Sequence, residues 1–288
     1  MSKKKNVVAS VKGRLLEIAR EEGRNHQLLL LRYFQERFLY RLSQSKYQSK
    51  FCLKGGAFLY AIEGQKSRVT KDIDFLGLRL SSNQDQIKAV LQEICKIPYQ
   101  EDGVDFNISS LTTEEIVKDG RYQGIRVGLT GFLDKTKQQL QIDIGFGDIV
   151  IPNPVLMTYP VILEMDPPEL LAYSIESTIA EKFEAMIDLG EINTRMKDFY
   201  DIYQLLLKQK TKFNLLRQAI FETFKQRETP CPKTHIIFQE TFSEDISRNR
   251  HWKVWLRKTK LDEKLEFSDV MQMIKEHLEP IYNELSLR

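Results

Sequence analysis

FCLKGGAFLYAIEGQKSRVTKDIDFLG, residues 51–77, contains the features from which the architecture of this chain can be predicted. A short apolar strand, 51–53, runs into Lys54 and the glycine pair Gly55 and Gly56. Apolar residues then recur at helical spacing, and a second strand follows a basic turn. Glycines at a strand-to-helix junction let backbone N–H groups approach phosphate oxygens, and the helix N-terminus favours negative charge. This order of elements predicts an α+β domain with a phosphate site at the junction.

The second strand carries an Asp-x-Asp pair, Asp72 and Asp74. Side chains two residues apart on a strand share a face, so both carboxylates point the same way while Ile73 and Phe75 point into the apolar layer behind. Carboxylates this close repel unless a cation lies between them, and hard oxygen ligands suit magnesium or manganese. Because Asp-x-Asp is common, a pair of acids without a metal is the alternative. The basic residues of the turn favour a triphosphate ligand, and they are Lys66, Arg68 and Lys71.

The composition is that of a globular protein. The 288 residues are 42% hydrophobic and 29% charged with a net charge of +3, so any nucleic-acid surface must come from local clustering. Three widely spaced cysteines argue against a disulfide framework and fit a reducing cytoplasm, and the four histidines show no zinc-like spacing with them. No apolar stretch follows the basic N-terminus, and the longest apolar runs are too short to span a bilayer. We therefore expect a cytoplasmic protein without a membrane segment.

A third acid lies further along the chain. Residues 139–148, QLQIDIGFGD, alternate between apolar and polar side chains, which predicts a strand with Asp143 and Gln141 on one face. A third carboxylate on a neighbouring strand would complete a two-metal cluster. A solvent-facing acid is the alternative, and Asp148 is a weaker candidate because the strand ends there. The other elements expected here are one helix over 10–45, a helix over 83–96 capped by Ser82 or Asn83, and strands over 104–111 and 122–129.

Five prolines interrupt residues 152–168 and make long regular elements improbable there. We expect this segment to separate a catalytic domain, 1–165, from a helical domain, 166–288, that contributes to the active-site cleft. Helices are expected from Ser174 onward and over 196–207, 213–227 and 268–285.

Two of these helices carry charged residues of interest. Lys182 lies beside the buried stripe of its helix, where a lysine can run its stem along apolar surface and present its ammonium at the rim of a cleft. A solvated lysine paired with Asp188 or Glu184 is the alternative. Asp198 and Asp201 are three apart and share a face of the next helix, where a surface ion pair would also explain them.

Residues 247–260, SRNRHWKVWLRKTK, combine basic side chains with two tryptophans. Such a patch can bind RNA through phosphate contacts and base stacking. However, Trp252 and Trp255 are three apart, as on one buried helical face, and we favour tryptophans in the core. The residues left for a rim that contacts a nucleic-acid backbone are Arg248, Arg250, Arg257, Lys258 and Lys260.

Three separated blocks together resemble a known family. They are Lys54-Gly55-Gly56 followed by Arg68-Val69-Thr70-Lys71-Asp72-Ile73-Asp74-Phe75, Ala-Glu-Lys at 180–182, and Lys-Asp-Phe-Tyr-Asp at 197–201. These blocks are similar to motifs of AbiEii/AbiGii-type nucleotidyltransferase toxins, members of the polymerase-β-like nucleotidyltransferase superfamily. The resemblance covers residues 51 to about 206. One departure is Gly56, where many members of the superfamily carry a serine whose hydroxyl touches phosphate.

The resemblance implies a fold, an activity and partners. The fold would be a polymerase-β-like core, a mixed sheet flanked by helices, followed by a helical lobe. The activity would be magnesium- or manganese-dependent transfer of a nucleoside monophosphate from a nucleoside triphosphate to the 3′ end of tRNA. The protein would be the toxin of a toxin–antitoxin or abortive-infection system in phage defence, with a cognate antitoxin as partner. The alternatives are a nucleotidyltransferase that modifies a small molecule such as an aminoglycoside, and a nucleotide-binding protein without activity.

The resemblance also assigns roles to individual residues. The implied catalytic residues are Asp72, Asp74, Lys182 and Asp198. The implied metal ligands are Asp72, Asp74 and Asp143. The implied nucleotide-binding residues are Lys54, Gly55, Gly56, Arg68, Thr70, Lys182 and Asp201.

Overall fold

The protein forms two compact units. A computed structural model describes residues 2–64, 67–68, 70–118 and 122–287. One unit comprises residues 1–147 and 155–172, and the other comprises 148–154 and 173–288. The division of the chain into two domains at residue 165 stays a prediction. Among the described helices, none has the length and the apolar character needed to cross a membrane.

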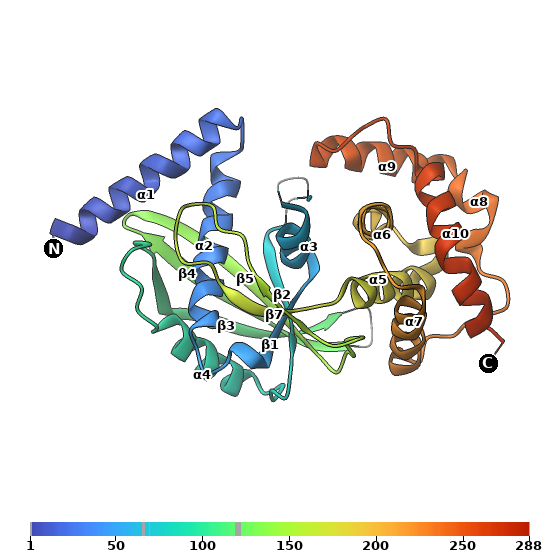
Figure 1. Ribbon diagram of the computed structural model, residues 1–288, viewed down its shortest axis with the longest axis horizontal. Coiled ribbons are helices and arrows are strands. Elements are labelled where there is room, and N and C mark those ends of the chain that lie inside the picture. The colour runs from blue at the N-terminus through green and yellow to red at the C-terminus, as the bar shows by residue number, and fades with distance from the viewer. Residues whose placement is uncertain (1, 65–66, 69, 119–121, 288) are drawn as a thin grey trace. The chain divides into compact units, whose positions relative to one another are not determined.

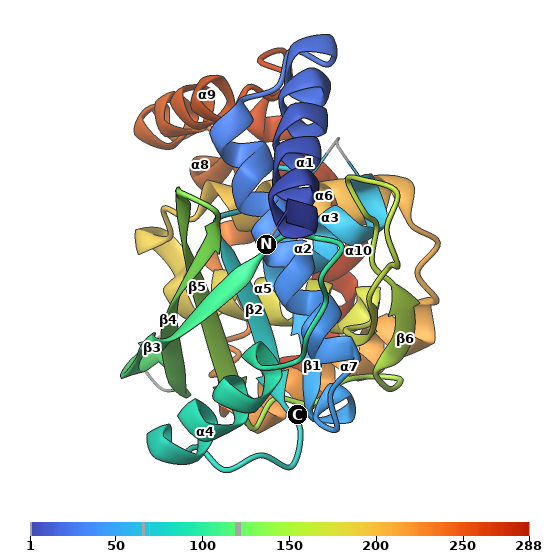
Figure 2. The ribbon, with the colours of Figure 1, turned by 90° about the vertical axis from the view of Figure 1, so that its left-hand side faces the viewer.

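A mixed sheet forms the centre of the first unit. In the described part of the chain, seven strands lie in the order β3-β4-β5-β2-β1-β7-β6, and Figure 2 shows β3, β4, β5 and β2 side by side. The pairs β2–β5 and β1–β7 are parallel, and the other neighbours are antiparallel. This arrangement confirms the α+β class. The strands are β1 (Phe51–Lys54), β2 (Asp72–Gly77), β3 (Asp105–Lys118), β4 (Tyr122–Leu133), β5 (Thr136–Phe146), β6 (Val155–Thr158) and β7 (Glu169–Ala172).

The segment from β1 to β2 folds as its sequence predicts. The chain turns from β1 directly into α3 (Gly55–Glu63), which packs on β1 and β2. Ile73 and Phe75 are buried in the core. The Phe75 ring packs edge to face on that of Phe51, with the ring centroids 5.3 Å apart. This apolar contact fixes one face of β2 in the core, so the alternate side chains of β2 are turned to the opposite face.

The expectation of one helix over residues 10–45 is wrong. The chain forms α1 (Ser2–Glu21) and α2 (His26–Ser43), with a break between them. Gly23 adopts a φ of +62°, and the Asn25 side chain accepts hydrogen bonds from Gln27 N and Leu28 N to begin the second helix. The apolar periodicity continues across this break, which is why the pattern alone suggested a single helix. The helix α2 packs on β5 and β7 (Figure 1).

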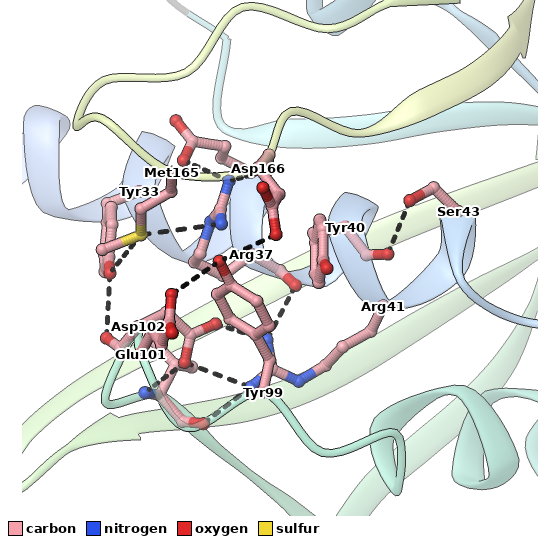
Figure 3. A network of polar contacts seen from close by, with 12 residues as sticks. Tyr33, Arg37, Tyr40, Arg41, Ser43, Tyr99, Glu101, Asp102, Met165 and Asp166 are labelled. Carbon is pink, nitrogen blue, oxygen red and sulfur yellow. Dashed lines mark hydrogen bonds and ion pairs between the residues drawn. The ribbon is translucent and has the colours of Figure 1, made fainter. Parts of the chain in front are cut away.

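Buried polar contacts hold α2 in place (Figure 3). Arg41 donates to Asp102 Oδ2 at 2.7 Å and to Asp102 Oδ1 at 3.3 Å, and both side chains are almost fully buried. Tyr33 donates to the Asp102 carbonyl at 2.8 Å, and Arg37 donates to the Asp166 carbonyl at 3.4 Å. These bonds tie α2 to two loops, so the helix acts as a fixed support for the sheet.

The α2 acid Glu36 makes stability depend on pH. It is 1% exposed, and burial raises its pKa from 4.5 to about 7 even though Arg37 lies 2.7 Å away. The folded protein keeps this proton up to about pH 7, whereas the unfolded chain releases it near pH 4.5. The free energy of unfolding therefore falls as the pH rises between these values.

We predict that Glu36→Gln gains stability relative to the wild type as the pH rises from 5 to 8. The glutamine keeps an acceptor for Arg37 but has no charge to bury. A change of about 1 kcal/mol shifts Tm by about 2–4 °C in a protein of this size. Thermal unfolding across the pH range measures the difference in Tm, with Glu21→Gln on the exposed surface as the control. A difference in Tm that is the same at both ends of the range would contradict the prediction.

The remaining elements of the first unit are close to those expected. The helix α4 (Gln84–Cys95) begins at Asn83, whose side chain accepts from Gln86 N at 3.0 Å. The strands β3 and β4 extend beyond the predicted ends and pair over most of their length. Neither β6 nor β7 was expected, because four-residue strands next to prolines leave no periodic signal.

The second unit is helical, as predicted. The Ser174 side chain accepts from Ser177 N at 3.0 Å and caps the first helix. The Phe183 ring contacts those of Phe224, Phe238 and Tyr282 and forms the centre of this core. The helices are α5 (Ile175–Leu189), α6 (Met196–Lys208), α7 (Phe213–Arg227), α8 (Glu240–Ser243), α9 (Ile246–Thr259) and α10 (Phe267–Leu285), joined by 3-10 turns at Gly190–Ile192 and Ile236–Phe238.

Of the two tryptophans of α9, Trp252 lies in the core as expected, whereas Trp255 is partly exposed. Trp252 is fully buried and donates to the Leu265 carbonyl at 2.8 Å, and Trp255 stacks on it with ring centroids 5.4 Å apart. The expectation that Arg248 belongs to an exposed rim is wrong, because its guanidinium lies over the Phe242 ring at 3.6 Å and donates to main-chain carbonyls. The side chains of α9 that are exposed and basic are Arg250, Arg257 and Lys258, with Lys260 just after the helix.

Candidate functional site

Three carboxylates of the first unit lie together. Asp72, Asp74 and Asp143 each offer an oxygen atom within 4.8 Å of those of the other two. The sheet explains this, because β2 and β5 are parallel neighbours in a register that places Asp74 beside Asp143. Asp143 is only 2% exposed, so the alternative of a solvent-facing strand acid is wrong. We call Asp72, Asp74 and Asp143 the acidic trio.

Neighbouring residues hold two of these carboxylates in place. The Thr70 hydroxyl donates to Asp72 Oδ1 at 2.6 Å. Gly55 has a φ of +64°, and a Cβ there would collide with the Asp74 carboxylate. A Cβ on Gly56 would lie 2.5 Å from Thr70 Cβ. Both glycines are therefore required for close packing beside the trio, a reason that the sequence does not reveal. Their contacts with phosphate, and that of Thr70, stay predictions.

The third carboxylate has a partner that the sequence analysis missed. Arg126 on β4 lies directly opposite Asp143 on β5. Its Nε donates to Asp143 Oδ1 at 2.9 Å and its Nη2 to Oδ2 at 3.0 Å. These hydrogen bonds raise the pKa of Arg126 further above its ordinary value. Arginine is common on strands, and only the register shows which acid it faces.

We predict that Gly55→Ala destabilises the protein and displaces Asp74. A non-glycine residue at this φ costs about 1 kcal/mol or more, and the added methyl group also collides with the carboxylate. Gly23→Ala is the matched control, since Gly23 has a φ of +62° and a Cβ there would meet no described atom within 4 Å. Unfolding in urea should show a lower free energy of unfolding in both variants than in the wild type, with the larger decrease for Gly55→Ala. Equal losses would contradict the displacement of Asp74.

The other predicted residues of this unit lie around the same junction. Lys54 precedes α3 and pairs in register with Asp74. Arg68 is half-buried between α3 and β2, and Lys66 lies outside the described residues. Asp148 belongs to the second unit, where it accepts from Arg227 Nη2 at 3.0 Å. Asp143, rather than Asp148, is thus the acid that joins Asp72 and Asp74.

A second cluster of charges lies in the helical unit. The Lys182 ammonium on α5 is 2.7 Å from Asp198 Oδ1 and 2.8 Å from Asp201 Oδ2, both on α6. The three side chains are 12%, 8% and 3% exposed, so this is not the surface ion pair given as an alternative. Glu184 bonds instead to Arg227, at 2.7 Å. Two carboxylates hold one ammonium in a fixed place, so Lys182, Asp198 and Asp201 form one group.

The sequence from residue 37 to 273 matches the family model described as nucleotidyl transferase AbiEii toxin, type IV TA system. The chain belongs to this family. The resemblance seen in the motifs is thereby confirmed, and the protein is a nucleotidyltransferase of the AbiEii toxin family. The family is assigned to type IV toxin–antitoxin systems, so an antitoxin partner and a nucleoside triphosphate substrate follow from membership.

Solved structures show the same fold. The protein JHP933 from Helicobacter pylori superposes with a TM-score of 0.51 at 14% identity, covering 91% of this chain and 95% of its own. A presumed nucleotidyltransferase from H. pylori superposes with a TM-score of 0.50 at 16% identity, covering 91% of this chain and 98% of its own. No curated protein matches the sequence significantly. The two structures thus share the fold of this chain at low sequence identity.

The acidic trio fits the divalent metal that nucleotidyltransferases use. Its donors are hard carboxylate oxygens, they come from two adjacent strands, and their spacing allows one ion to contact all three. Asp72, Asp74 and Asp143 are the residues of the AbiEii chain that would hold such an ion.

Proposed function

We propose that this AbiEii-family enzyme moves a nucleoside monophosphate from a nucleoside triphosphate to the 3′ end of tRNA, with release of pyrophosphate and with magnesium or manganese as the metal. The observation that carries the proposal is the acidic trio, with its three oxygens within 4.8 Å of one another beside the β1–α3 junction. Family membership supports the reaction type, and the hard oxygen donors support the metal.

In the first unit, different residues would bind the metal and the triphosphate. Asp72, Asp74 and Asp143 would hold the metal, which when bound supplies stabilisation for the charge that develops on phosphoryl oxygens. The helix α3 begins at the glycine pair, directly after Lys54. Backbone N–H groups at such a helix start suit a phosphate group. Lys54, Arg68 and Thr70 would complete the binding of the triphosphate.

The lysine of the helical unit would act on the same substrate. Lys182 carries a fixed ammonium, and a positive charge held in place stabilises developing phosphate charge without reorganisation. Asp198 and Asp201 hold the ammonium in its orientation. We propose catalysis by Asp72, Asp74, Lys182 and Asp198, with Asp201 as a positioning partner.

The acceptor is the part of the proposal that rests most on the family. A toxin that modifies the 3′ end of tRNA would stop translation, which fits an abortive-infection response to phage in the cytoplasm. The exposed basic residues of α9 support an RNA acceptor, since arginines and lysines on one surface favour phosphate contacts. Modification of an aminoglycoside is the competing outcome that the experiment must separate.

The test supplies the purified protein with each α-labelled nucleoside triphosphate, magnesium or manganese, and one acceptor at a time. The acceptors are total tRNA, tRNA with an oxidised 3′ end, and an aminoglycoside. We expect metal-dependent label on intact tRNA and none on oxidised tRNA, because oxidation removes the attacking hydroxyl. Label on the aminoglycoside alone would show that the acceptor is a small molecule and not tRNA. No label on any acceptor would overturn the proposal.

A further inference from the structure

The contact between Arg126 and Asp143 has the geometry of a two-point clamp. The two residues face each other across antiparallel strands, and two N–H groups of one guanidinium donate to the two oxygens of one carboxylate at 2.9 and 3.0 Å. A bidentate pair fixes the plane of the carboxylate as well as its position. Asp143 therefore cannot rotate its carboxylate without breaking both bonds.

The clamped carboxylate also belongs to the acidic trio. Gln141 adds a weak donor at 3.4 Å to Asp143 Oδ1. An Asp143 oxygen still lies within 4.8 Å of oxygens of Asp72 and Asp74, so the carboxylate reaches both its arginine and the trio.

The charges at the acidic trio give a second reason for an arginine beside Asp143. Three carboxylates converge at the trio, and one guanidinium beside Asp143 offsets part of their repulsion. An arginine at this place keeps the acids together before any cation arrives.

We propose that Arg126 is a positioning residue of the metal site, which fixes the Asp143 carboxylate in the orientation that lets it bind the ion together with Asp72 and Asp74. This inference rests on the proposed function, because it requires the trio to bind a metal. Outer partners of metal-binding carboxylates typically contribute about 10- to 100-fold to metal affinity or activity. Arg126 acts through Asp143 and does not itself touch the metal.

The surroundings of Arg126 differ from those of a purely structural arginine. Arg41, clamped on Asp102, is 3% exposed and also donates to the main-chain carbonyls of Arg37 and Val104, so it ties segments of the fold together. The Arg126 side chain is 38% exposed, and among the described residues its hydrogen bonds and ion pairs are with the carboxylates of Asp143 and Glu114. Its second acid, Glu114, lies 3.8 Å away and is 64% exposed.

The experiment measures Mn²⁺ binding to the full chain, without nucleotide, by titration calorimetry and by the electron paramagnetic resonance signal of free Mn²⁺. We expect Arg126→Met to weaken binding about 10- to 100-fold. Arg126→Lys should be intermediate, because lysine keeps the charge but loses the planar two-point contact. Glu114→Gln is the matched control: it removes the other acid that contacts Arg126, leaves Asp143 clamped and should keep the wild-type affinity.

Each outcome decides the inference. Binding by Arg126→Met as tight as by the wild type, or tighter, overturns the positioning role while the proposed function stands. Absence of Mn²⁺ binding by the wild type overturns both. If Arg126→Met does not fold, Arg126→Lys carries the test: it should need more Mn²⁺ for half-maximal nucleotide transfer yet regain the wild-type rate at saturation. A lysine variant with unchanged metal dependence overturns the inference.

Discussion

Asp74→Asn should lower nucleotide transfer by about three orders of magnitude while leaving the protein folded, a loss of the size seen when a group that stabilises transition-state charge is removed. Asparagine has the size of aspartate, so the close contact with Gly55 remains. What disappears is one charged oxygen of a trio whose members come within 4.8 Å of one another. The rate of label transfer to tRNA at saturating triphosphate and Mn²⁺ measures the effect.

A binding measurement separates this loss from damage to the fold. Saturating Mn²⁺ should raise the Tm of the wild type, since a ligand at 100 times its Kd adds about 2.7 kcal/mol to the free energy of unfolding. Asp74→Asn should show little of this rise. Asp134→Asn is the control, because Asp134 is an exposed acid in the turn between β4 and β5 and its φ of +54° suits asparagine. A fully active Asp74→Asn variant would remove the trio from the mechanism.

The local pattern of residues 51–77 was enough to predict the centre of the fold. Alternation on β2 separated Ile73 and Phe75 from the two acids, and the structure buries the apolar pair as expected. The break between α1 and α2 was missed because Gly23 and Asn25 end and begin helices without interrupting the apolar stripe. Periodicity reports which face is buried, whereas a helix boundary depends on caps.

The site was predictable where it depends on neighbours in sequence and not where it depends on register. Asp72 and Asp74 share a strand, so their common face follows from spacing alone. The pairing of Asp143 with Arg126 is a relation between β5 and β4 that a shift of one residue would abolish. Arg248 is the opposite case: its sequence neighbours predict an exposed basic residue, but the side chain is buried against Phe242. Side chains that act across elements need the fold before they can be recognised.

Lys182→Met should lower both stability and transfer, for two different reasons. The ammonium lies between Asp198 and Asp201, which are 8% and 3% exposed, and its removal leaves two buried carboxylates facing each other. Breaking a buried ion pair by removing one partner costs about 3–5 kcal/mol. The proposed role at the triphosphate adds a loss of transfer that does not depend on this cost. Unfolding in urea and the rate of transfer measure the two effects.

A double variant that restores the net charge of the Lys182 cluster separates the loss of stability from the loss of transfer. In Lys182→Met/Asp201→Asn the cluster loses one charge of each sign, so most of the stability should return while transfer stays low, because no ammonium is left to meet the triphosphate. Arg227→Met/Glu184→Gln is the control in the same unit: it repeats the change at a buried arginine that contacts Glu184 at 2.7 Å and Asp148 at 3.0 Å and has no proposed part in catalysis. There, transfer should recover with stability. If transfer returned with stability in the Lys182 double variant as well, Lys182 would be a structural residue, and the charge that stabilises the departing pyrophosphate would have to come from elsewhere in the chain.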